Sequence, residues 1–462
     1  MQGRWHSEFL SIRGQRDDRV PVAAYGVCQP SLSVDLHEVC GLDGRPQVRA
    51  IPSRSACGCG LSSTDDPSQR GGSRRQRRAR AAASTAAAYA CAVHAICSLC
   101  ATSVILGPHV YRCGCGGPVD LVEPPLAGEP DAAAQGVWRY LSWLPVREPV
   151  SLGEPTTPLA ALDWGDLDVV AKLEGALPTG SFKDRGAAVL VAGLREHGST
   201  GGVVDSSGNA GASIAAYCAR AGLACEVMAP ANASPGKLTQ IAAYGARLAA
   251  VEGPRSASTD AALARAVEGL SYMSHMWHPL FLAGTETFAF ELAEQLDGRM
   301  PDWVVIPSAA GTLLLGAERG FRRLATAGRI DRAPRLLAVQ SAAATPIVTA
   351  WDAGADLPAV VETRQGSAEG LLTARPPRGR QVLAALRATG GAAVAVSDDE
   401  LWAGHRQAAR QGIYCEPTSA VALGAITMAR ARGILTAGDR VVCALTGTGL
   451  KSTAAIGAAI AG

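Results

Sequence analysis

A lysine at position 183 is the residue of this chain that most directly indicates covalent chemistry. It lies in the segment PTGSFKDRGAA, residues 178–188, and is one of only four lysines among 43 basic residues. An arginine guanidinium does not lose its proton in proteins, whereas a neutral lysine amine can attack a carbonyl to form a Schiff base. Lys183 is therefore a candidate nucleophile toward an aldehyde cofactor. The alternative is a surface lysine in the first turn of a helix, which is expected to begin near Ser181, although a cation is unfavourable there.

The segment SSGNAGAS, residues 206–213, follows an expected strand and begins an expected helix. Its small residues let the backbone approach a ligand closely, and the first amides of the helix are free to bind an anion. Ser206, Ser207 and Asn209 could hold a carboxylate, and Asn209 could donate a hydrogen bond to a phenolic oxygen of a cofactor ring. The alternative is an ordinary strand–helix turn with a serine cap.

Two later segments have the same position after a strand, PSAAGTLLLG at 307–316 and LTGTGLK at 445–451. Gly311 and Thr312 begin an expected helix, whose first amides and threonine hydroxyl suit a phosphate. Thr446 follows a buried strand, where its hydroxyl could face a ring nitrogen without forming the charged pair that an aspartate would form. Each segment alone could be a plain glycine turn.

Four cysteines near the N-terminal third form a possible metal site. Cys97 and Cys100 form the pair CSLC, and Cys113 and Cys115 follow in YRCGCGGPVDL. Four thiolates at such spacing can close a tetrahedral zinc site, although the second pair is tighter than the usual CxxC. The alternative is a small β-ribbon, residues 91–125, packed on the main body with free thiols or a lost metal.

Composition excludes several classes of protein. The 462 residues are enough for two or three domains, and the net charge of +2 argues against nucleic acid or an anionic membrane as the main partner. We expect no membrane span and no secretory signal. Isolated cysteines later in the chain indicate a reducing, cytoplasmic compartment. No dinucleotide fingerprint, P-loop or HExxH motif is present, and the histidines do not cluster.

The chain divides into three regions. Residues 1–90 are polar and rich in Gly, Ser and Arg, and we interpret them as a disordered or wrongly included leader. A basic run at 74–80 could instead be a nucleic-acid arm or a targeting element. The Cys-rich ribbon follows, and residues 126–462 alternate short apolar runs with helical stretches. This rhythm predicts an open, mostly parallel α/β sheet with ligands at the carboxyl ends of its strands.

Taken in order, these segments resemble the fold-type II pyridoxal-phosphate enzymes, most closely the threonine synthase-like family. The resemblance covers residues 95–460. It rests on eight segments: YRCGCGGPVDL, SLGEPTTPL, KLEGALPTGSFKDRGA, SSGNAGAS, GTETFAFELAEQL, AEGL, EPTSAVALGA and LTGTGLK.

The resemblance implies two open, twisted parallel-sheet α/β domains with the cofactor in the cleft between them. The large cofactor-binding domain would comprise 126–185 and 300–462, and the small domain 186–299. A homodimer and a small amino-acid substrate are also implied.

The resemblance also assigns roles to single residues. Lys183 would form the Schiff base with pyridoxal 5′-phosphate and then act as acid and base. The remaining cofactor-binding residues would be Phe182 beside the ring, Asn209 at the 3′ oxygen, Thr446 at the ring nitrogen, and the phosphate loop Ser308, Ala309, Ala310, Gly311 and Thr312. Ser206, Ser207, Gly208 and Asn209 would bind the substrate carboxylate.

Two departures from the family pattern concern the substrate. Leu177 stands where asparagine usually precedes the proline, and HPLF, beginning at His278, stands where an NPxR-like segment helps to hold a substrate phosphate. Either His278 partly replaces the arginine or the substrate carries no phosphate. The first reading implies a lyase that converts O-phosphohomoserine and water to threonine and phosphate. The second implies another β- or γ-elimination or replacement on a serine- or threonine-like amino acid.

Overall fold

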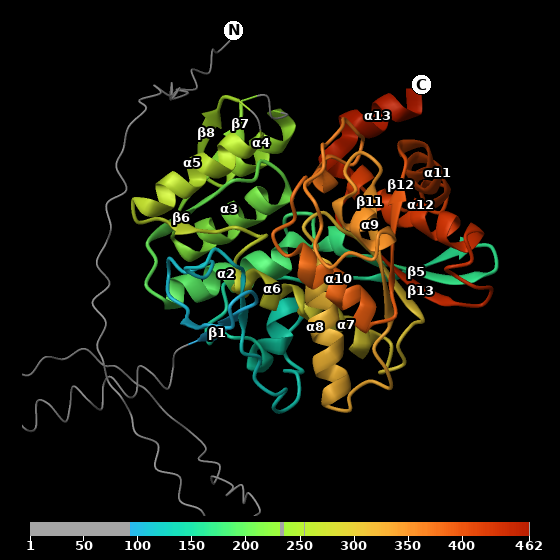
Figure 1. Ribbon diagram of the computed structural model, residues 1–462, viewed down its shortest axis with the longest axis horizontal. Helices are drawn as coiled ribbons and strands as arrows, with labels where there is room; N and C mark the ends of the chain where they lie inside the picture. The colour runs from blue at the N-terminus through green and yellow to red at the C-terminus, as the bar shows by residue number, and fades with distance from the viewer. Residues whose placement is uncertain (1–92, 232–234, 254, 462) are drawn as a thin grey trace, which may run out of the picture. The chain divides into compact units, whose positions relative to one another are not determined.

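The computed structural model describes residues 93–231, 235–253 and 255–461. The expected leader, residues 1–90, lies outside the described residues. The described chain forms a three-stranded ribbon, a six-stranded sheet and a four-stranded sheet, with helices around the two larger sheets (Figure 1). The prediction of an α/β fold with mostly parallel sheets is confirmed.

The six-stranded sheet has the strand order β12-β11-β10-β13-β5-β4, in which β4 alone is antiparallel to its neighbour. Its central strands read WVVIP and RVVCAL and are almost wholly buried, as expected for parallel strands covered on both faces. The strands are β4 (Leu159–Trp164), β5 (Leu167–Leu173), β10 (Trp303–Pro307), β11 (Arg335–Ser341), β12 (Ala392–Val396) and β13 (Arg440–Leu445).

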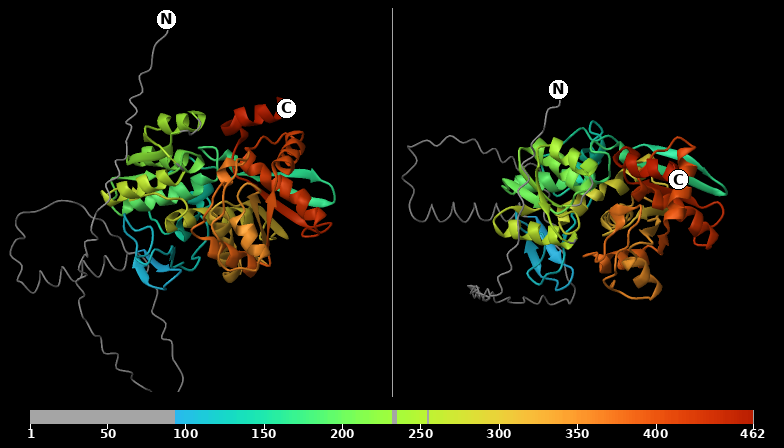
Figure 2. Two further views of the ribbon diagram at one scale, coloured as in Figure 1. Left: turned by 45° about the horizontal axis from the view of Figure 1, so that its top comes forward. Right: turned by 90° about the horizontal axis from the view of Figure 1, so that it is seen from above.

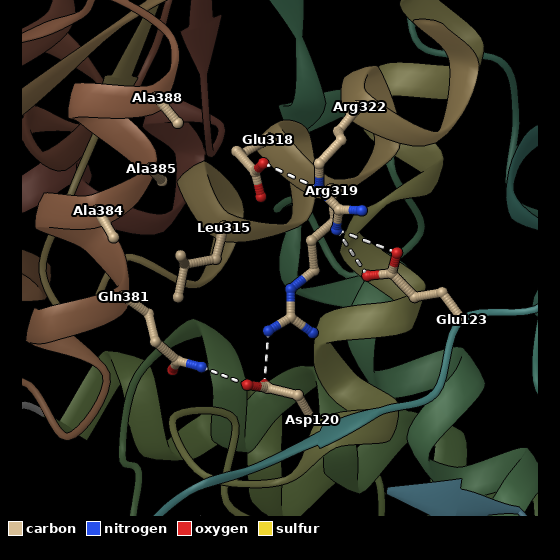
Figure 3. A pocket seen from close by; sticks show the side chains of 10 residues that line it. All are labelled: Asp120, Glu123, Leu315, Glu318, Arg319, Arg322, Gln381, Ala384, Ala385 and Ala388. Atoms are coloured by element: carbon tan, nitrogen blue, oxygen red, sulfur yellow. Dashed lines mark hydrogen bonds and ion pairs between the residues drawn. The ribbon is translucent and has the colours of Figure 1, made fainter. Parts of the chain in front are cut away.

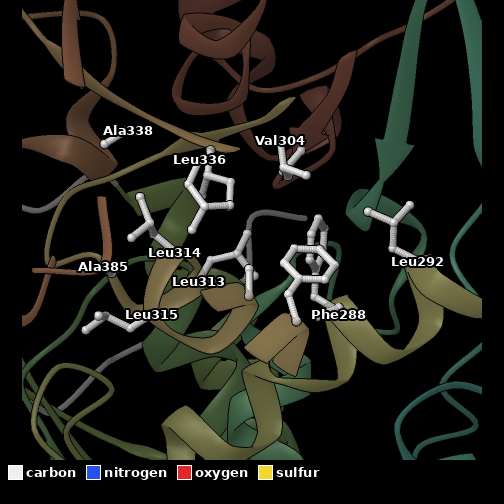
Figure 4. Packing of buried hydrophobic residues seen from close by; sticks show 14 of the residues in the cluster. Phe288, Leu292, Val304, Leu313, Leu314, Leu315, Leu336, Ala338 and Ala385 are labelled. Carbon is white, nitrogen blue, oxygen red and sulfur yellow. The ribbon is translucent and has the colours of Figure 1, made fainter. Parts of the chain in front are cut away.

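Alternate residues of these strands enter two separate cores. Val304 and Leu336 pack with Phe288 and Leu313 on one face (Figure 4), whereas Val305 packs on the other. The first face is covered by α7 (Thr287–Gln295), α8 (Thr312–Thr326), α9 (Pro346–Asp352) and α10 (Gly379–Ala388), and the second by α11 (Asp398–Ala409) and α12 (Pro417–Ala431). The C-terminal helix is α13 (Thr453–Ala461).

The four-stranded parallel sheet has the order β8-β7-β6-β9. Its strands are β6 (Gly201–Val204), β7 (Ala224–Pro230), β8 (Arg247–Val251) and β9 (Ser271–Tyr272). The helices that follow or precede these strands are α2 (Lys183–Glu196), α3 (Asn209–Ala221), α4 (Pro235–Ala243), α5 (Arg255–Val267) and α6 (Pro279–Thr285). Val204 packs in one core with α2, α3 and α6, and Val203 packs in another with α5. Figure 2 shows these elements in green and yellow beside the orange and red part of the chain.

The two larger sheets draw their strands from different parts of the chain. Strands within 126–185 and 300–462 supply the six-stranded sheet, and strands within 186–299 supply the four-stranded sheet. Helix α7 lies inside 186–299 but packs in the core of the six-stranded sheet. The expected domain boundaries themselves stay a prediction.

The ribbon consists of β1 (His94–Cys97), β2 (Ser103–Ile105) and β3 (Val119–Leu121), antiparallel in the order β2-β1-β3. Its own core is small and includes Ala95 and Val119. Short 3₁₀ helices lie at Gly136–Trp143, Glu174–Ala176, Glu369–Leu371 and Gly449–Ser452. Among the described residues, none of the helices combines the length and the apolar character needed to span a bilayer.

A buried group of four charges joins β5, α2 and α7. The Arg185 guanidinium donates from Nε to Glu174 Oε2 at 2.6 Å and from Nη2 to Glu291 Oε1 at 2.8 Å, and Lys172 Nζ donates to Glu291 Oε1 at 2.7 Å. All four side chains are at most 2% exposed. Burial alone would raise the pKa of Glu291, but Arg185 and Lys172 outweigh it and lower that pKa to about 2. Two positive and two negative charges therefore balance inside the protein.

Replacing Arg185 by leucine leaves two buried carboxylates without their main partner. We expect the Arg185→Leu variant to lose about 3–5 kcal/mol of unfolding free energy, because an uncompensated buried charge is costly. Arg195→Leu on the same helix is the matched control, since Arg195 pairs with Glu148 at side-chain exposures of 34% and 77% and should lose less than about 1 kcal/mol. Urea unfolding of both variants measures the difference. Equal losses would contradict the role given to the buried charges.

Candidate active site around Lys183

Lys183 lies where the loop 178–182 is joined to the end of β13. The Phe182 N–H donates to the Thr446 carbonyl at 2.9 Å, and the Thr448 N–H donates to the Gly180 carbonyl at 3.0 Å. These bonds tie the loop to the residues that follow β13, and α2 begins at Lys183, two residues after Ser181, near which the sequence predicted its start. The amine is therefore presented from the first residue of a helix at the carboxyl edge of the large sheet.

The Lys183 amine is half-buried against aromatic rings. Its Nζ lies 4.3 Å from the centroid of the Phe182 ring and 5.9 Å from that of Phe281. Burial lowers the pKa of Lys183 to about 7, and the Glu416 carboxylate acts against this shift. A large fraction of the amine is therefore neutral near neutral pH, which is the state a nucleophile or base requires.

Glu416 is a site residue to which sequence reasoning gave no role. It precedes α12, its carboxylate is buried, and its two oxygens accept from Asn209 Nδ2 at 3.0 and 3.1 Å. A Cβ on Gly447 would lie 2.5 Å from Glu416 Oε1, so the glycine makes room for the carboxylate. The segment EPTSAVALGA was the available signal, but nothing in it shows that Glu416 meets Asn209 and influences Lys183.

Asn209 is the first residue of α3, and it follows Ser206, Ser207 and Gly208 as expected. Gly208 occupies the N-cap position without a side-chain cap, which leaves the first amides of the helix available to an anion. A Cβ on Gly211 would lie 1.8 Å from the Ser206 carbonyl oxygen, so the turn requires this glycine. The carboxylate role of the two serines stays a prediction.

Asp184 ties the lysine loop to α3. Its Oδ1 accepts from Ser213 Oγ and from Thr179 Oγ1, both at 2.6 Å, and its Oδ2 accepts from the Thr179 N–H at 2.7 Å. Burial raises the pKa of Asp184 to about 6, against the effect of these hydrogen bonds. Asp184 thus holds the start of α2 against α3, and the starts of both helices face the site.

The expected phosphate loop follows β10 and precedes α8. Gly311 has φ +78° and precedes the first helical residue, Thr312, and a Cβ on Gly311 would lie 2.3 Å from Val382 Cγ2. The first amides of α8 have no acceptor inside the helix, and the helix dipole favours an anion at this end. Glycine is thus required where main-chain donors gather.

The other residues of the expected phosphate loop, Ser308, Ala309 and Ala310, offer a ligand main-chain groups rather than side chains. Ser308 turns its hydroxyl back to the Ile306 carbonyl at 2.9 Å. Ala309 and Ala310 carry no polar side-chain atoms. The phosphate contacts expected of these three residues therefore reduce to their main-chain groups, and they stay a prediction.

Thr446 follows β13 and is buried. Its Oγ1 lies 2.9 Å from Ser419 Oγ, which also accepts from the Gly447 N–H at 2.8 Å. This pair of hydroxyls is neutral. Such a pair suits an unprotonated ring nitrogen, as proposed for Thr446 from the sequence.

Comparison with known proteins agrees with this geometry. Residues 150–447 match the family described as pyridoxal-phosphate dependent enzyme. The threonine synthase of Methanocaldococcus jannaschii is 34% identical over 372 residues, which are 77% of this chain and 92% of that protein. That of Methanosarcina acetivorans is 31% identical over 372 residues, 78% and 92% of the two chains. The chain belongs to the threonine synthase-like pyridoxal-phosphate enzymes.

Solved structures of pyridoxal-phosphate enzymes show the same fold. Maize serine racemase aligns with a TM-score of 0.57 at 20% identity, over 66% of this chain and 92% of that chain. A threonine deaminase of T.th. aligns with a TM-score of 0.55 at 26% identity, over 63% and 92%. The predictions of a fold-type II architecture and of a pyridoxal-phosphate-dependent lyase are confirmed.

The residues present fit pyridoxal phosphate. A half-buried amine of lowered pKa, an amide on Asn209, a neutral hydroxyl on Thr446 and a helix start with a required glycine at Gly311 match its aldehyde, phenolic oxygen, ring nitrogen and phosphate. Each of these groups follows a strand end or begins a helix of the pyridoxal-phosphate fold. Family membership establishes the cofactor, whereas the single contacts stay predictions.

His278, unlike the residues that fit the cofactor, has the contacts of a helix cap. It caps the N-terminus of α6, where its Nδ1 accepts from the Leu280 N–H at 3.3 Å. Burial, together with the positive charges of His197 and Arg378, lowers the pKa of His278 to about 3. His197 follows the last residue of the 14-residue helix α2, about 20 Å along the axis from Lys183. The described contacts of His278 are thus those of a helix cap, and its contact with substrate stays a prediction.

The lowered pKa of Lys183 predicts how cofactor attachment depends on pH. We expect the rate at which the cofactor-free enzyme takes up pyridoxal phosphate to rise with pH and to level off just above pH 7, because the amine is then neutral. The growth of visible absorbance, followed from about pH 5.5 to about pH 9.5, measures this rate. Lys183→Ala should develop no such band. A rate that still rises above pH 9 would contradict the low pKa.

Removing the charge of Glu416 should move this pH dependence downward. Glu416 raises the pKa of Lys183, so Glu416→Gln should shift the midpoint to lower pH while the shape of the side chain is kept. Glu362→Gln is the control, because Glu362 is exposed. The same absorbance measurement compares both variants with the wild-type enzyme. An unchanged or higher midpoint in Glu416→Gln would remove Glu416 from the electrostatics of Lys183.

Proposed function

We propose that this enzyme converts O-phosphohomoserine and water to threonine and phosphate. The observation that carries the proposal is the half-buried Lys183, whose amine of lowered pKa is electrostatically linked to Glu416, the partner of Asn209. The substrate is inferred from the curated relatives, which are threonine synthases matched over 92% of their length. The fold alone would not select this substrate, since one fold serves many reactions.

The chain supplies the groups that such a reaction needs. When bound, pyridoxal phosphate acts as an electron sink for negative charge that develops on the amino acid. Lys183 would hold the cofactor covalently and then, as a neutral amine, remove and return protons at the substrate carbons. Asn209, held by Glu416, would orient the 3′ oxygen, and the α8 amides would hold the phosphate. The α3 amides would bind the substrate carboxylate.

A positive charge near the lysine loop favours a phosphorylated substrate. Lys451 is half-buried, and its Nζ donates to the Thr179 carbonyl and to Gln240 Oε1, both at 2.8 Å. An ammonium has three donors, so one of them is free for a phosphate oxygen. The HPLF segment lacks the arginine that the family usually has there. We infer that Lys451 supplies part of this missing positive charge.

A second candidate is an elimination on an unphosphorylated serine- or threonine-like amino acid. The observation that favours it is His278, which stands in HPLF where the family usually has a phosphate-binding segment and which caps a helix here. The similar folds of a serine racemase and a threonine deaminase are compatible with such chemistry. Both candidates use the same Lys183.

The remaining expectations about partners are proposals of the same kind. The ligand would be a small amino acid, and neither nucleic acid nor a membrane is expected as a partner. A homodimer and a cytoplasmic location likewise stay predictions.

Phosphate release decides between the two candidate substrates. We expect the purified enzyme to release one phosphate for each threonine formed from O-phosphohomoserine, and Lys183→Ala to release none. Lys451→Gln should raise KM for this substrate several-fold with a smaller change in kcat, because it removes a charge that binds the phosphate in ground state and transition state alike. Ammonia release from serine or threonine without phosphate release from O-phosphohomoserine would select the second candidate.

A further inference from the structure

The four cysteines of the ribbon converge on one point. The Sγ atoms of Cys97, Cys100, Cys113 and Cys115 all lie within 4.8 Å of one another. The sulfurs of Cys97 and Cys115 are 3.5 Å apart, and those of Cys100 and Cys113 are 3.7 Å apart. Four thiolates bound tetrahedrally to zinc at about 2.3 Å have sulfurs about 3.8 Å apart. The observed spacing is therefore close to that of a zinc–tetrathiolate.

The local backbone is shaped around these sulfurs. The Leu99 N–H donates to Cys97 Sγ at 3.4 Å, a bond that stabilises a thiolate. A Cβ on Gly117 would lie 3.0 Å from Cys97 Sγ and 2.8 Å from Leu99 Cγ, so glycine makes room for the sulfur. Cys97 and Cys113 are buried, and Cys100 and Cys115 are exposed, so one side of the cluster is open to an entering ion.

We propose that these four cysteines bind one zinc ion that stabilises the ribbon. The ribbon's own apolar core is small, and small units of this size commonly need a metal or a disulfide to stay folded. Binding converts four thiols to thiolates and releases their protons to solvent, with no change of oxidation state. Two disulfides are the competing use of the cysteines, but all four are free here, at sulfur distances well above the roughly 2.0 Å of a disulfide.

The ribbon is fastened to the catalytic part through Asp120, three residues after Gly117. Asp120 Oδ1 accepts from Arg319 of α8 at 2.5 Å and from Arg378, just before α10, at 2.7 Å, and its Oδ2 accepts from Gln381. Figure 3 shows Asp120, Arg319 and Gln381 converging at the edge of a pocket of about 340 Å³ lined by α8 and α10. The ribbon thus joins two helices of the large sheet.

A contiguous path leads from this carboxylate to the phosphate loop. Arg378 is buried and also donates from Nη2 to the Trp277 and Val119 carbonyls, each at 2.8 Å. One turn further along α10, Val382 packs against the position of Gly311. A ribbon fixed by zinc therefore holds Asp120 in place, and Asp120 keeps Arg378 and α10 against the phosphate loop. Asp120 is a positioning residue that does not touch the substrate.

The metal content of the full-length protein tests the zinc site. Protein prepared under reducing conditions with zinc supplied should contain about one zinc per chain by elemental analysis, and a thiol-blocking reagent should release that zinc. The Cys100→Ser, Cys115→Ser double variant should hold at least tenfold less zinc. Cys225→Ala, in β7 and outside the cluster, should hold as much as wild type.

Three outcomes would overturn the zinc site. They are wild-type protein without stoichiometric zinc after reconstitution, iron in place of zinc, and disulfides among the four cysteines found by mass spectrometry of alkylated peptides. Because none of these measurements uses catalysis, the result stands apart from the proposed reaction.

Cofactor affinity tests the path through Asp120. Asp120→Asn should keep its zinc yet bind pyridoxal phosphate several-fold more weakly, and the double cysteine variant should show at least the same loss. Arg322→Ala is the control, because Arg322 lines the same pocket but pairs with Glu123 and Glu318 instead of Asp120. Unchanged affinity in both Asp120→Asn and the double cysteine variant would overturn the supporting role of the ribbon.

Discussion

The buried pairing of Arg185 with Glu174 and Glu291 is the constraint on which the site depends. Three consecutive residues at the start of α2 have three different roles: Lys183 is the candidate nucleophile, Asp184 binds α3 through Ser213, and Arg185 binds Glu174, directly after β5, and Glu291 of α7. A shift of α2 by one residue would break the second and third contacts together. Contacts with the elements of both sheets therefore fix the position of α2. They orient the Lys183 amine although α2 has no side-chain cap at its N-terminus.

Charge balance explains how the amine can have a low pKa in such surroundings. The network around Arg185 is neutral in sum, so it adds little net field at Lys183, and burial is left as the main influence. Among the described residues, Glu416 is the carboxylate that acts on this pKa, and Asn209 shares it through two hydrogen bonds. The carboxylate therefore moderates the shift rather than cancelling it.

Sequence patterns predicted several regular elements because the apolar residues that a strand or helix buries follow one another at short, regular spacing in the chain. The strands β6, β10 and β13 were predicted from the chain alone, as were the helices α3 and α8. The antiparallel edge strand β4 was not predicted, although its partner β5 follows after only two residues. The Arg185–Glu291 pair spans 106 residues and the Asn209–Glu416 pair 207 residues, and no local pattern records either of them.

The cofactor phosphate and a substrate phosphate call for different kinds of groups in this chain. The groups that suit the phosphate of the cofactor are mostly main-chain amides at the start of α8, and these depend on a glycine and a helix rather than on particular side chains. Alanines at 309 and 310 are therefore compatible with the site. A substrate phosphate instead needs cationic side chains outside that frame, where His278 caps a helix and Lys451 meets the lysine loop. In this chain, therefore, the main-chain groups that suit the cofactor phosphate are separate from the side chains proposed to bind a substrate phosphate.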